Sequence, residues 1–186
     1  MNRIVILGFT GSGKTSLAAA VAERLRAPHV ELDALFWEPD WRLPPAEVFR
    51  ARVARATAGP AWVLEGNPLD QRAQHAAYLE DLWPRAETIV WLDYPRWLVL
   101  WRLWWRTVRR ILTRDTLWGG NRESLRVHFL SRQSMFPWAW RSFPVHRELY
   151  RCLVERIVAA GGDVVHLRSP REARLWLLGL PVRPPG

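Results

Sequence analysis

Short, uninterrupted apolar runs alternate along this chain with longer stretches of helical periodicity. Residues 4–7, Ile-Val-Ile-Leu, are the first such run, and they have the pattern of a strand that is buried on both faces. Similar runs predict four more strands, at residues 29–32, 62–65, 88–92 and 164–167. Apolar spacing of three and four residues predicts helices at residues 16–26, 45–58, 69–82, 96–112 and 145–160, and a last helix starts at Ser169-Pro170.

This alternation of strands and helices indicates an α/β fold with a parallel sheet, doubly wound by right-handed crossovers. The length of 186 residues fits a single domain, residues 1–186. Residues 113–144 interrupt the pattern, because their periodicity is weak and they contain Gly119-Gly120 and several arginines. We expect this segment to be a lid or insert that faces the ligand.

The first predicted strand leads directly into a glycine-rich loop. The sequence Gly8-Phe9-Thr10-Gly11-Ser12-Gly13-Lys14-Thr15 fits the pattern G-x-x-x-x-G-K-[ST] at every fixed position, and a predicted helix follows it. In this motif, backbone N–H groups at the start of the helix hold nucleotide phosphates. Lys14 is the only lysine among 27 basic residues, which fits the need for a compact ammonium between the β- and γ-phosphates. We predict that ATP or GTP is held by Gly8, Gly11, Ser12, Gly13, Lys14, Thr15 and Ser16.

The cation that accompanies the nucleotide needs oxygen ligands. The Thr15 hydroxyl is one candidate, and an acid at the end of a neighbouring strand is the other. Glu65 and Asp93 both end predicted strands. Asp93 is followed by Tyr94, Pro95 and a long predicted helix, so capping of that helix explains it at least as well. We therefore expect Thr15 and Glu65 to hold Mg²⁺.

Asp33 follows the second predicted strand, and two interpretations of it stay open. A carboxylate at this position could face an acceptor hydroxyl across from the γ-phosphate and serve as a base or positioning group. It could equally be a loop residue that bonds to nearby backbone. The aromatic residues after it, Phe36, Trp37 and Trp41, could line a substrate pocket but are more often part of a core.

The predicted helix at residues 96–112 carries a row of arginines on one face. Residues with the i, i+4 and i+7 or i+8 spacing are Arg102, Arg106 and either Arg109 or Arg110. Arg122 and Arg126 follow in the lid segment. Arginines of this kind stabilise the charge that develops on a transferring phosphoryl group. A solvated basic face, or a contact with acidic lipid or nucleic acid, is the other interpretation.

The composition adds constraints on partners and location. The net charge of +9 favours an anionic partner such as a nucleotide, a nucleic acid or an acidic membrane surface. Cys152 is the single cysteine, which excludes an intrachain disulfide and fits a reducing cytoplasm. No secretory signal is visible, and residues 88–105 contain too many charged residues to span a bilayer. We expect a soluble cytoplasmic protein without a membrane partner.

Several motifs occur together in an order that resembles one family. They are the phosphate loop, Leu32-Asp33-Ala34-Leu35-Phe36-Trp37, Trp62-Val63-Leu64-Glu65-Gly66-Asn67, Trp91-Leu92-Asp93-Tyr94-Pro95-Arg96, Gly120-Asn121-Arg122-Glu123-Ser124 and Leu167-Arg168-Ser169-Pro170-Arg171-Glu172. Over nearly the whole chain they are similar to the bacterial adenylate-kinase-related P-loop proteins often labelled DNA topology modulation proteins. The resemblance implies a nucleoside-monophosphate-kinase-like, three-layer fold with a five-stranded parallel sheet in the order 2-3-1-4-5. It also implies ATP and Mg²⁺ as cofactors, lid arginines at Arg102, Arg106, Arg122 and Arg126, and Arg168 near the purine ring.

Two departures from adenylate kinases leave the acceptor open. The third strand ends in Glu65-Gly66-Asn67-Pro68 where adenylate kinases have Asp-Gly-Phe-Pro-Arg, so the arginine that grips the AMP phosphate is missing from this motif. The second strand ends in Asp33, which is more similar to shikimate and gluconate kinases, whose acceptor is a hydroxyl.

The function that we expect is an ATP-dependent phosphotransferase, which moves the γ-phosphoryl group of Mg-ATP to a nucleotide or another small acceptor. The phosphate loop, the strand-end acids and the arginine row support it. A second hypothesis is a nucleotide-dependent regulatory or nucleic-acid-binding protein, supported by the net charge and by tryptophans beside arginines. The third is a simple ATPase with water in the acceptor site.

Overall fold

The computed structural model describes residues 1–66, 82–113, 118–120 and 135–182 of the protein. In this part of the chain, five parallel strands form one sheet in the order β2-β3-β1-β4-β5. The strands are β1 (Arg3–Gly8), β2 (His29–Glu31), β3 (Trp62–Glu65), β4 (Thr88–Leu92) and β5 (Asp163–Leu167). The predicted α/β fold class and the strand order 2-3-1-4-5 are therefore confirmed.

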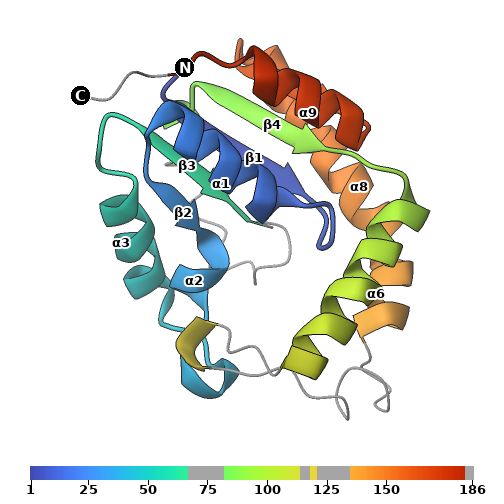
Figure 1. Cartoon of the computed structure of the whole chain (residues 1–186). Coiled ribbons are helices and arrows are strands. Elements are labelled where there is room, and N and C mark those ends of the chain that lie inside the picture. The colour runs from blue at the N-terminus through green and yellow to red at the C-terminus, as the bar shows by residue number, and fades with distance from the viewer. Residues whose placement is uncertain (67–81, 114–117, 121–134, 183–186) are drawn as a thin grey trace.

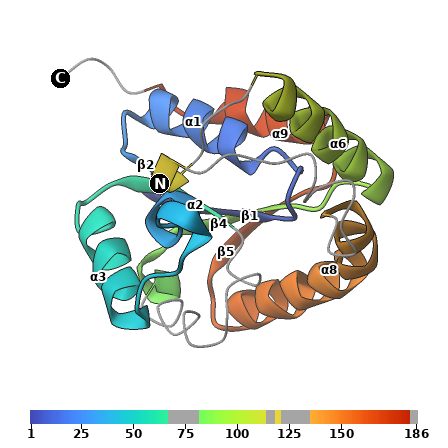
Figure 2. The same ribbon diagram turned by 90° about the horizontal axis from the view of Figure 1, so that it is seen from below.

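Helices cover both faces of this sheet and give the molecule three layers (Figure 1). The helices are α1 (Lys14–Leu25), α2 (Leu32–Phe36), α3 (Ala46–Ala56), α6 (Arg96–Thr113), α8 (Met135–Ala159) and α9 (Pro170–Gly179), with short 3-10 turns η1 (Pro39–Trp41), η2 (Trp83–Arg85) and η3 (Trp118–Gly120). Seen from below, α1, α9 and α6 lie on one side of the sheet and α3 and α8 on the other (Figure 2). The ends of β1, β2 and β3 open towards the space between α2 and α6 (Figure 1).

The core follows from the alternation of side chains along buried strands. In β1, Ile4 and Ile6 pack with α1, whereas Val5 and Leu7 pack with α3 and α8. Each of these four side chains is at most 1% exposed. Trp62 of β3 is fully buried on the face that α3 and α8 cover. A strand with large apolar residues on both faces needs cover on both, and the helices on the two sides of the sheet provide it for β1.

The second strand ends one residue before the predicted boundary. Leu32 begins α2, is 1% exposed, and packs so closely on Gly66 that a Cβ on this glycine would lie 2.7 Å from it. Leu32, the last residue of the predicted strand, is therefore buried as the first residue of a helix instead. The predicted helix at residues 69–82 lies, apart from residue 82, outside the described residues.

The helix α8 begins at Met135 rather than at residue 145, and it runs through Pro144. A proline inside a helix leaves the carbonyl four residues earlier without its helical partner. Arg96 donates a hydrogen bond to that carbonyl, which belongs to Trp140, and its guanidinium lies 3.4 Å from the centre of the Trp140 ring. Phe143 is buried in the core. This part of α8 is therefore fixed both by Arg96 and by the packing of Phe143.

The two faces of α6 differ. Val99 and Leu103 are buried in the core. The opposite face exposes four tryptophans, Trp97, Trp101, Trp104 and Trp105. We call these four residues, together with the exposed Trp140 of α8, the tryptophan surface. None of the described helices is both long and apolar enough to cross a membrane.

Candidate active site

The phosphate loop connects β1 to α1 (Figure 1). Its shape depends on two glycines in the left-handed region, Gly11 at φ 86° and Gly13 at φ 95°, which residues with a Cβ rarely adopt. Gly11 also lies against α6, and a Cβ there would be 2.7 Å from the carbonyl oxygen of Val99. Within the loop, the Ser12 N–H donates to the Phe9 carbonyl across 3.0 Å. The motif thus forms a compact turn at a helix N-terminus, which is a favourable place for anions.

A cavity of about 790 Å³ opens beside this loop. Its size lies within the range of small-molecule sites. The walls come from the loop, α1, the ends of β2 and β3, α2, α6, η3 and α9. Among the predicted site residues, the cavity brings together Gly11, Ser12, Gly13, Lys14, Thr15, Ser16, Asp33, Glu65, Arg102 and Arg106. Gly8 lies behind the loop, where its carbonyl accepts a hydrogen bond from Tyr150.

The first two residues of α1 line the cavity. Lys14 folds back over the loop, and its Nζ donates to the carbonyl oxygen of Phe9 across 3.2 Å. The Thr15 hydroxyl donates to Oε1 of Glu65 across 3.0 Å. Hydroxyl and carboxylate oxygens are the ligands that Mg²⁺ takes. Thr15 and Glu65 are therefore placed where they can hold one cation together.

Glu65 is a buried acid at the end of β3. Its exposed fraction is 4%, and this burial raises the pKa of its carboxyl above the ordinary value. Lys14 and the hydrogen bond from Thr15 lower the pKa, whereas Asp33 and Glu31 raise it further. A buried carboxylate with acidic neighbours is destabilised in its charged form, and a bound cation would relieve this.

Two more acids line the same side of the cavity. Asp33 lies in α2 rather than in a loop. Glu31, the last residue of β2, accepts a hydrogen bond from Nε1 of Trp118 across 3.0 Å. In the described part of the cavity wall, the β2 and β3 side is therefore acidic, while the arginines come from α6 and α9. The site thus has an acidic half and a basic half on either side of the phosphate loop.

The arginine row of α6 turns towards the phosphate loop. Nη1 of Arg102 donates to the carbonyl oxygen of Ser12 across 3.2 Å. Nη2 of Arg106 donates to the Thr10 hydroxyl across 3.0 Å. Both guanidinium groups are thus within reach of any phosphate that the loop binds.

The other predicted arginines differ in whether they line the cavity. Arg110 lines the cavity with its guanidinium 5.9 Å from the centre of the Trp118 ring, whereas Arg109 is exposed and does not line it. Arg122 and Arg126 lie outside the described residues. Of the lid predicted at residues 113–144, the structure describes η3 and the beginning of α8.

The other strand-end acid, Asp93, has a different environment. It is buried, and Arg147 contacts both of its oxygens, at 2.6 and 2.9 Å. Nε2 of His166 lies 3.0 Å from Oδ2 of the same carboxyl. These partners belong to α8 and β5, so Asp93 joins three elements and does not line the cavity of the phosphate loop. Glu65 is therefore the strand-end acid that lines the cavity of the phosphate loop.

Arg168 lies away from this cavity. Its side chain is exposed and lines a separate hollow between α8 and β5, next to Asp93. Its backbone N–H donates to Glu172, whose carboxyl also accepts from the Ser169 hydroxyl. This capping box begins α9. In α9, the arginine that lines the phosphate-loop cavity is Arg174. The contact of Arg168 with a purine ring stays a prediction from the resemblance.

Sequence reasoning assigned no role to several residues that line the cavity, namely Glu31, Tyr94, Trp118 and Arg174. The position of Glu31 could have been inferred from the sequence. Strand alternation places its side chain on the same face as that of His29, and it lies two residues before Asp33, a predicted site residue. The positions of Trp118 and Arg174 could not, since tertiary packing brings them to the site.

Comparisons with known proteins give the fold a name. No family model matches the sequence, and no curated protein matches it. Among solved structures, the shikimate kinase from Acinetobacter baumannii in complex with shikimate is 17% identical, over 96% of this chain and 89% of that one, with a TM-score of 0.50. The shikimate kinase from Bacteroides thetaiotaomicron is 13% identical, over 95% of this chain and 94% of that one, with a TM-score of 0.53.

The chain has the fold of the P-loop kinases. Both neighbours match along almost the whole chain, and the parallel sheet in the order 2-3-1-4-5 agrees with theirs. The wider expectation, a P-loop kinase fold, is thus borne out. The narrower resemblance to the DNA topology modulation type stays a prediction.

Proposed function

We propose that this protein is an ATP-dependent phosphotransferase, which transfers the γ-phosphoryl group of Mg-ATP to a hydroxyl of a small molecule. The observation that carries the proposal is the convergence of three groups on one cavity. These are the phosphate loop with Lys14, the Thr15–Glu65 pair and the carboxyl of Asp33. Phosphoryl transfer needs little more than these parts, since it depends on positioning and charge stabilisation.

Each group has a role in this reaction. The loop and Lys14 bind the β- and γ-phosphates, while Thr15 and Glu65 hold Mg²⁺. The cation offsets the phosphate charge when it is bound. Asp33 positions the acceptor hydroxyl and takes its proton while the new bond from oxygen to phosphorus forms. The bond between the γ-phosphorus and the β-phosphate oxygen breaks, and ADP leaves.

The arginines of α6 stabilise the phosphoryl group during transfer. Arg102 and Arg106 contact the backbone of Ser12 and the hydroxyl of Thr10. Both acceptors belong to the phosphate loop, so the arginines exchange a neutral partner for a phosphate oxygen with little movement. Charged partners give the stronger hydrogen bond. Arg122 and Arg126 remain candidates for the same role on sequence grounds.

The charge distribution in the cavity favours a hydroxyl over a phosphate as the acceptor. Glu31, Asp33 and Glu65 line the β2 and β3 side, where an acceptor would face the γ-phosphate. A phosphorylated acceptor would be repelled by these carboxylates. The hydroxyl groups of a polyol, in contrast, donate hydrogen bonds to carboxylates.

The test is to incubate the purified protein with Mg-ATP and a panel of acceptors, and to identify phosphorylated products by mass. The panel contains shikimate, gluconate, nucleosides and nucleoside monophosphates, and K14A is the control. We expect ADP release that depends on a hydroxyl acceptor and that K14A abolishes. Release without any acceptor would indicate an ATPase instead, and phosphorylation of a monophosphate would overturn the choice of a hydroxyl.

The tryptophan surface favours a second candidate function, the binding of single-stranded nucleic acid. Exposed aromatic rings can stack on bases, and arginines contact the backbone. No acid occurs in the described segments 96–113 and 135–147, which form this side of the molecule. Trp101 and Trp104 are stacked, with their ring centres 5.8 Å apart.

This second candidate is tested by titrating the protein with a single-stranded oligonucleotide at increasing salt. Binding that weakens steeply with salt, and that the double variant W101A/W104A loses while K14A retains it, would support the candidate. Weak binding that salt does not change would remove it.

A further inference from the structure

Three potential metal ligands lie on one face of the sheet beneath the cavity. His29 and Glu31 are two residues apart in β2, so both side chains point to the same face. In the parallel register Glu31 pairs with Glu65 of β3. Paired residues of adjacent strands are close neighbours, at about 4.8 Å between strands. The strand pattern and the register thus bring the imidazole and both carboxylates together.

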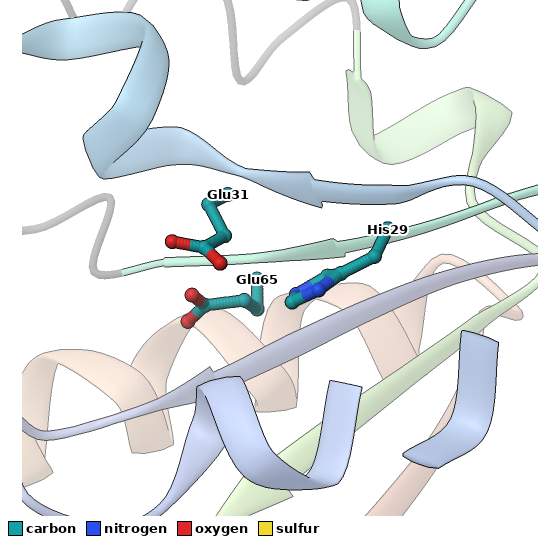
Figure 3. Close-up of side chains that lie close together, drawn as sticks. All are labelled: His29, Glu31 and Glu65. Atoms are coloured by element: carbon teal, nitrogen blue, oxygen red, sulfur yellow. The ribbon is translucent and has the colours of Figure 1, made fainter. Parts of the chain in front are cut away.

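Figure 3 shows these three side chains, which come from neighbouring strands and lie around one small space. One ligand atom from each of His29, Glu31 and Glu65 lies within 4.8 Å of the others. Zn²⁺ binds imidazole nitrogen and carboxylate oxygen at about 2.0–2.2 Å, so ligands around it are roughly 3.4 Å apart. Small rotations of the side chains are enough to close this difference.

The environment of the imidazole is a second and independent observation. Nε2 of His29 is shielded from solvent and makes no hydrogen bond with any residue that the structure describes. A buried polar atom without a partner loses the hydrogen bonds that water would give it. Beside it, the carboxyl group of Glu65 is also buried, and the Glu31 carboxyl group lies next to it. A cation between the three groups would satisfy the nitrogen and both carboxylates at once.

We propose that His29, Glu31 and Glu65 form a binding site for a divalent transition-metal ion of the Zn²⁺ class. The site binds this ion in the absence of nucleotide. One imidazole nitrogen with carboxylate oxygens suits Zn²⁺, Co²⁺ or Mn²⁺. Mg²⁺ takes oxygen ligands and keeps several waters, so an imidazole selects against it. Nothing in the phosphotransferase proposal requires His29, and this site goes beyond that proposal.

The site has a consequence for the proposed reaction, because it shares Glu65 with the expected Mg²⁺ site. An ion held by His29 and Glu31 draws the Glu65 carboxylate away from the Thr15 hydroxyl, which now donates to it across 3.0 Å. Zn²⁺ bound here therefore inhibits phosphoryl transfer by competing for this carboxylate. This consequence rests on the proposed function, whereas the binding itself does not.

The experiment is a titration of the metal-free protein with Co²⁺, in the absence of ATP and acceptor. The visible absorption of protein-bound Co²⁺ is the readout, and calorimetry with Zn²⁺ gives the affinity. We expect saturable binding of one ion, which excess Mg²⁺ does not displace. H29A and E31Q should each weaken it by about tenfold or more.

The matched control is H166Q, which removes a histidine that contacts Asp93 outside this cluster. We expect it to bind Co²⁺ like the unchanged protein, and thermal melts show that each variant is folded. Equal binding by H29A and the unchanged protein, or no saturable binding at all, would overturn the proposal. Because no nucleotide is present, this result is independent of whether the protein is a kinase.

Discussion

The Thr15 hydroxyl donates a hydrogen bond to Oε1 of Glu65 across 3.0 Å. This contact joins the first turn of α1 to the end of β3. Both oxygens are ligands of the kind that Mg²⁺ prefers, and they already lie next to the phosphate loop. The fold thus places the two cation ligands that we propose in contact with each other, and the proposed site can be tested through its pH dependence.

The substitution E65Q should raise the melting temperature of the cation-free protein at neutral pH. Burial raises the pKa of this carboxyl above its ordinary value of 4.5. The folded state therefore holds the proton more tightly than the unfolded chain. The stability that this provides is fully present below pH 4.5 and is lost as the pH rises through the raised pKa. An amide has no charge to bury, so E65Q avoids this loss.

Thermal melts across the acid and neutral range measure this effect. The advantage of E65Q should vanish below pH 4.5, and the variant should lose the stabilisation that added Mg-ATP gives the unchanged protein. A variant that is less stable at every pH would show that the carboxylate is not destabilised by its burial.

The substitution D33N should lower kcat by about 100-fold and leave the KM for ATP unchanged, if Asp33 accepts the proton of the acceptor. An amide is nearly the same size but cannot take a proton. The measurement is steady-state ADP release with the acceptor that the panel identifies. D40N is a matched control, because Asp40 is exposed and lies outside the cavity. Equal loss in both variants, or a loss of stability alone in D33N, would show a structural role.

R102A and R106A should each reduce kcat/KM by about 100-fold, because each removes a charged donor beside the phosphates. R109A removes an arginine of the same helix that is exposed and does not line the cavity, so it should keep full activity. The comparison separates a phosphate role from a general effect of positive charge. Similar losses in all three variants would support the general effect instead.

D93N should destabilise the protein by about 1–2 kcal/mol and leave catalysis intact. The carboxyl is buried and bonded to Arg147 and His166, but the Arg147 side chain is 58% exposed, so solvent screening reduces the charge contribution. Urea unfolding measures the change, and E148Q, which breaks an exposed ion pair with Arg151, should have almost no effect. If D93N instead abolishes turnover without loss of stability, Asp93 rather than Glu65 serves the cation.

The sheet could be predicted from the sequence because its strands are buried on both faces. Runs such as residues 4–7 and 88–92 leave no polar face, and only a parallel sheet covered by helices on both sides accommodates them. The start of α8 could not be predicted, because Pro144 reads as a helix breaker until Arg96 is seen to bond the carbonyl that the proline leaves free.

The candidate site could likewise be predicted only in part from the sequence. The positions of Lys14 and Thr15 follow from a local motif, since the loop and the helix after it are continuous in sequence. The partners that meet them across the cavity depend on strand order and helix packing. Glu31 lies beside Glu65 only because β2 pairs with β3. His29, which carries no recognisable metal spacing along the chain, joins them through the same pairing.

The central position of β1 has a consequence for how the protein is made. Ile4 pairs with Val63 on one side and with Thr88 on the other, and parallel neighbours of this kind cannot form through a tight hairpin. The phosphate loop directly follows β1, but both strands that pair with β1 are translated after the loop. Such non-local pairing slows folding and leaves the apolar edges of β1 exposed in the meantime. Nascent chains that end before β4 should therefore lack nucleotide affinity and depend on chaperones to stay soluble.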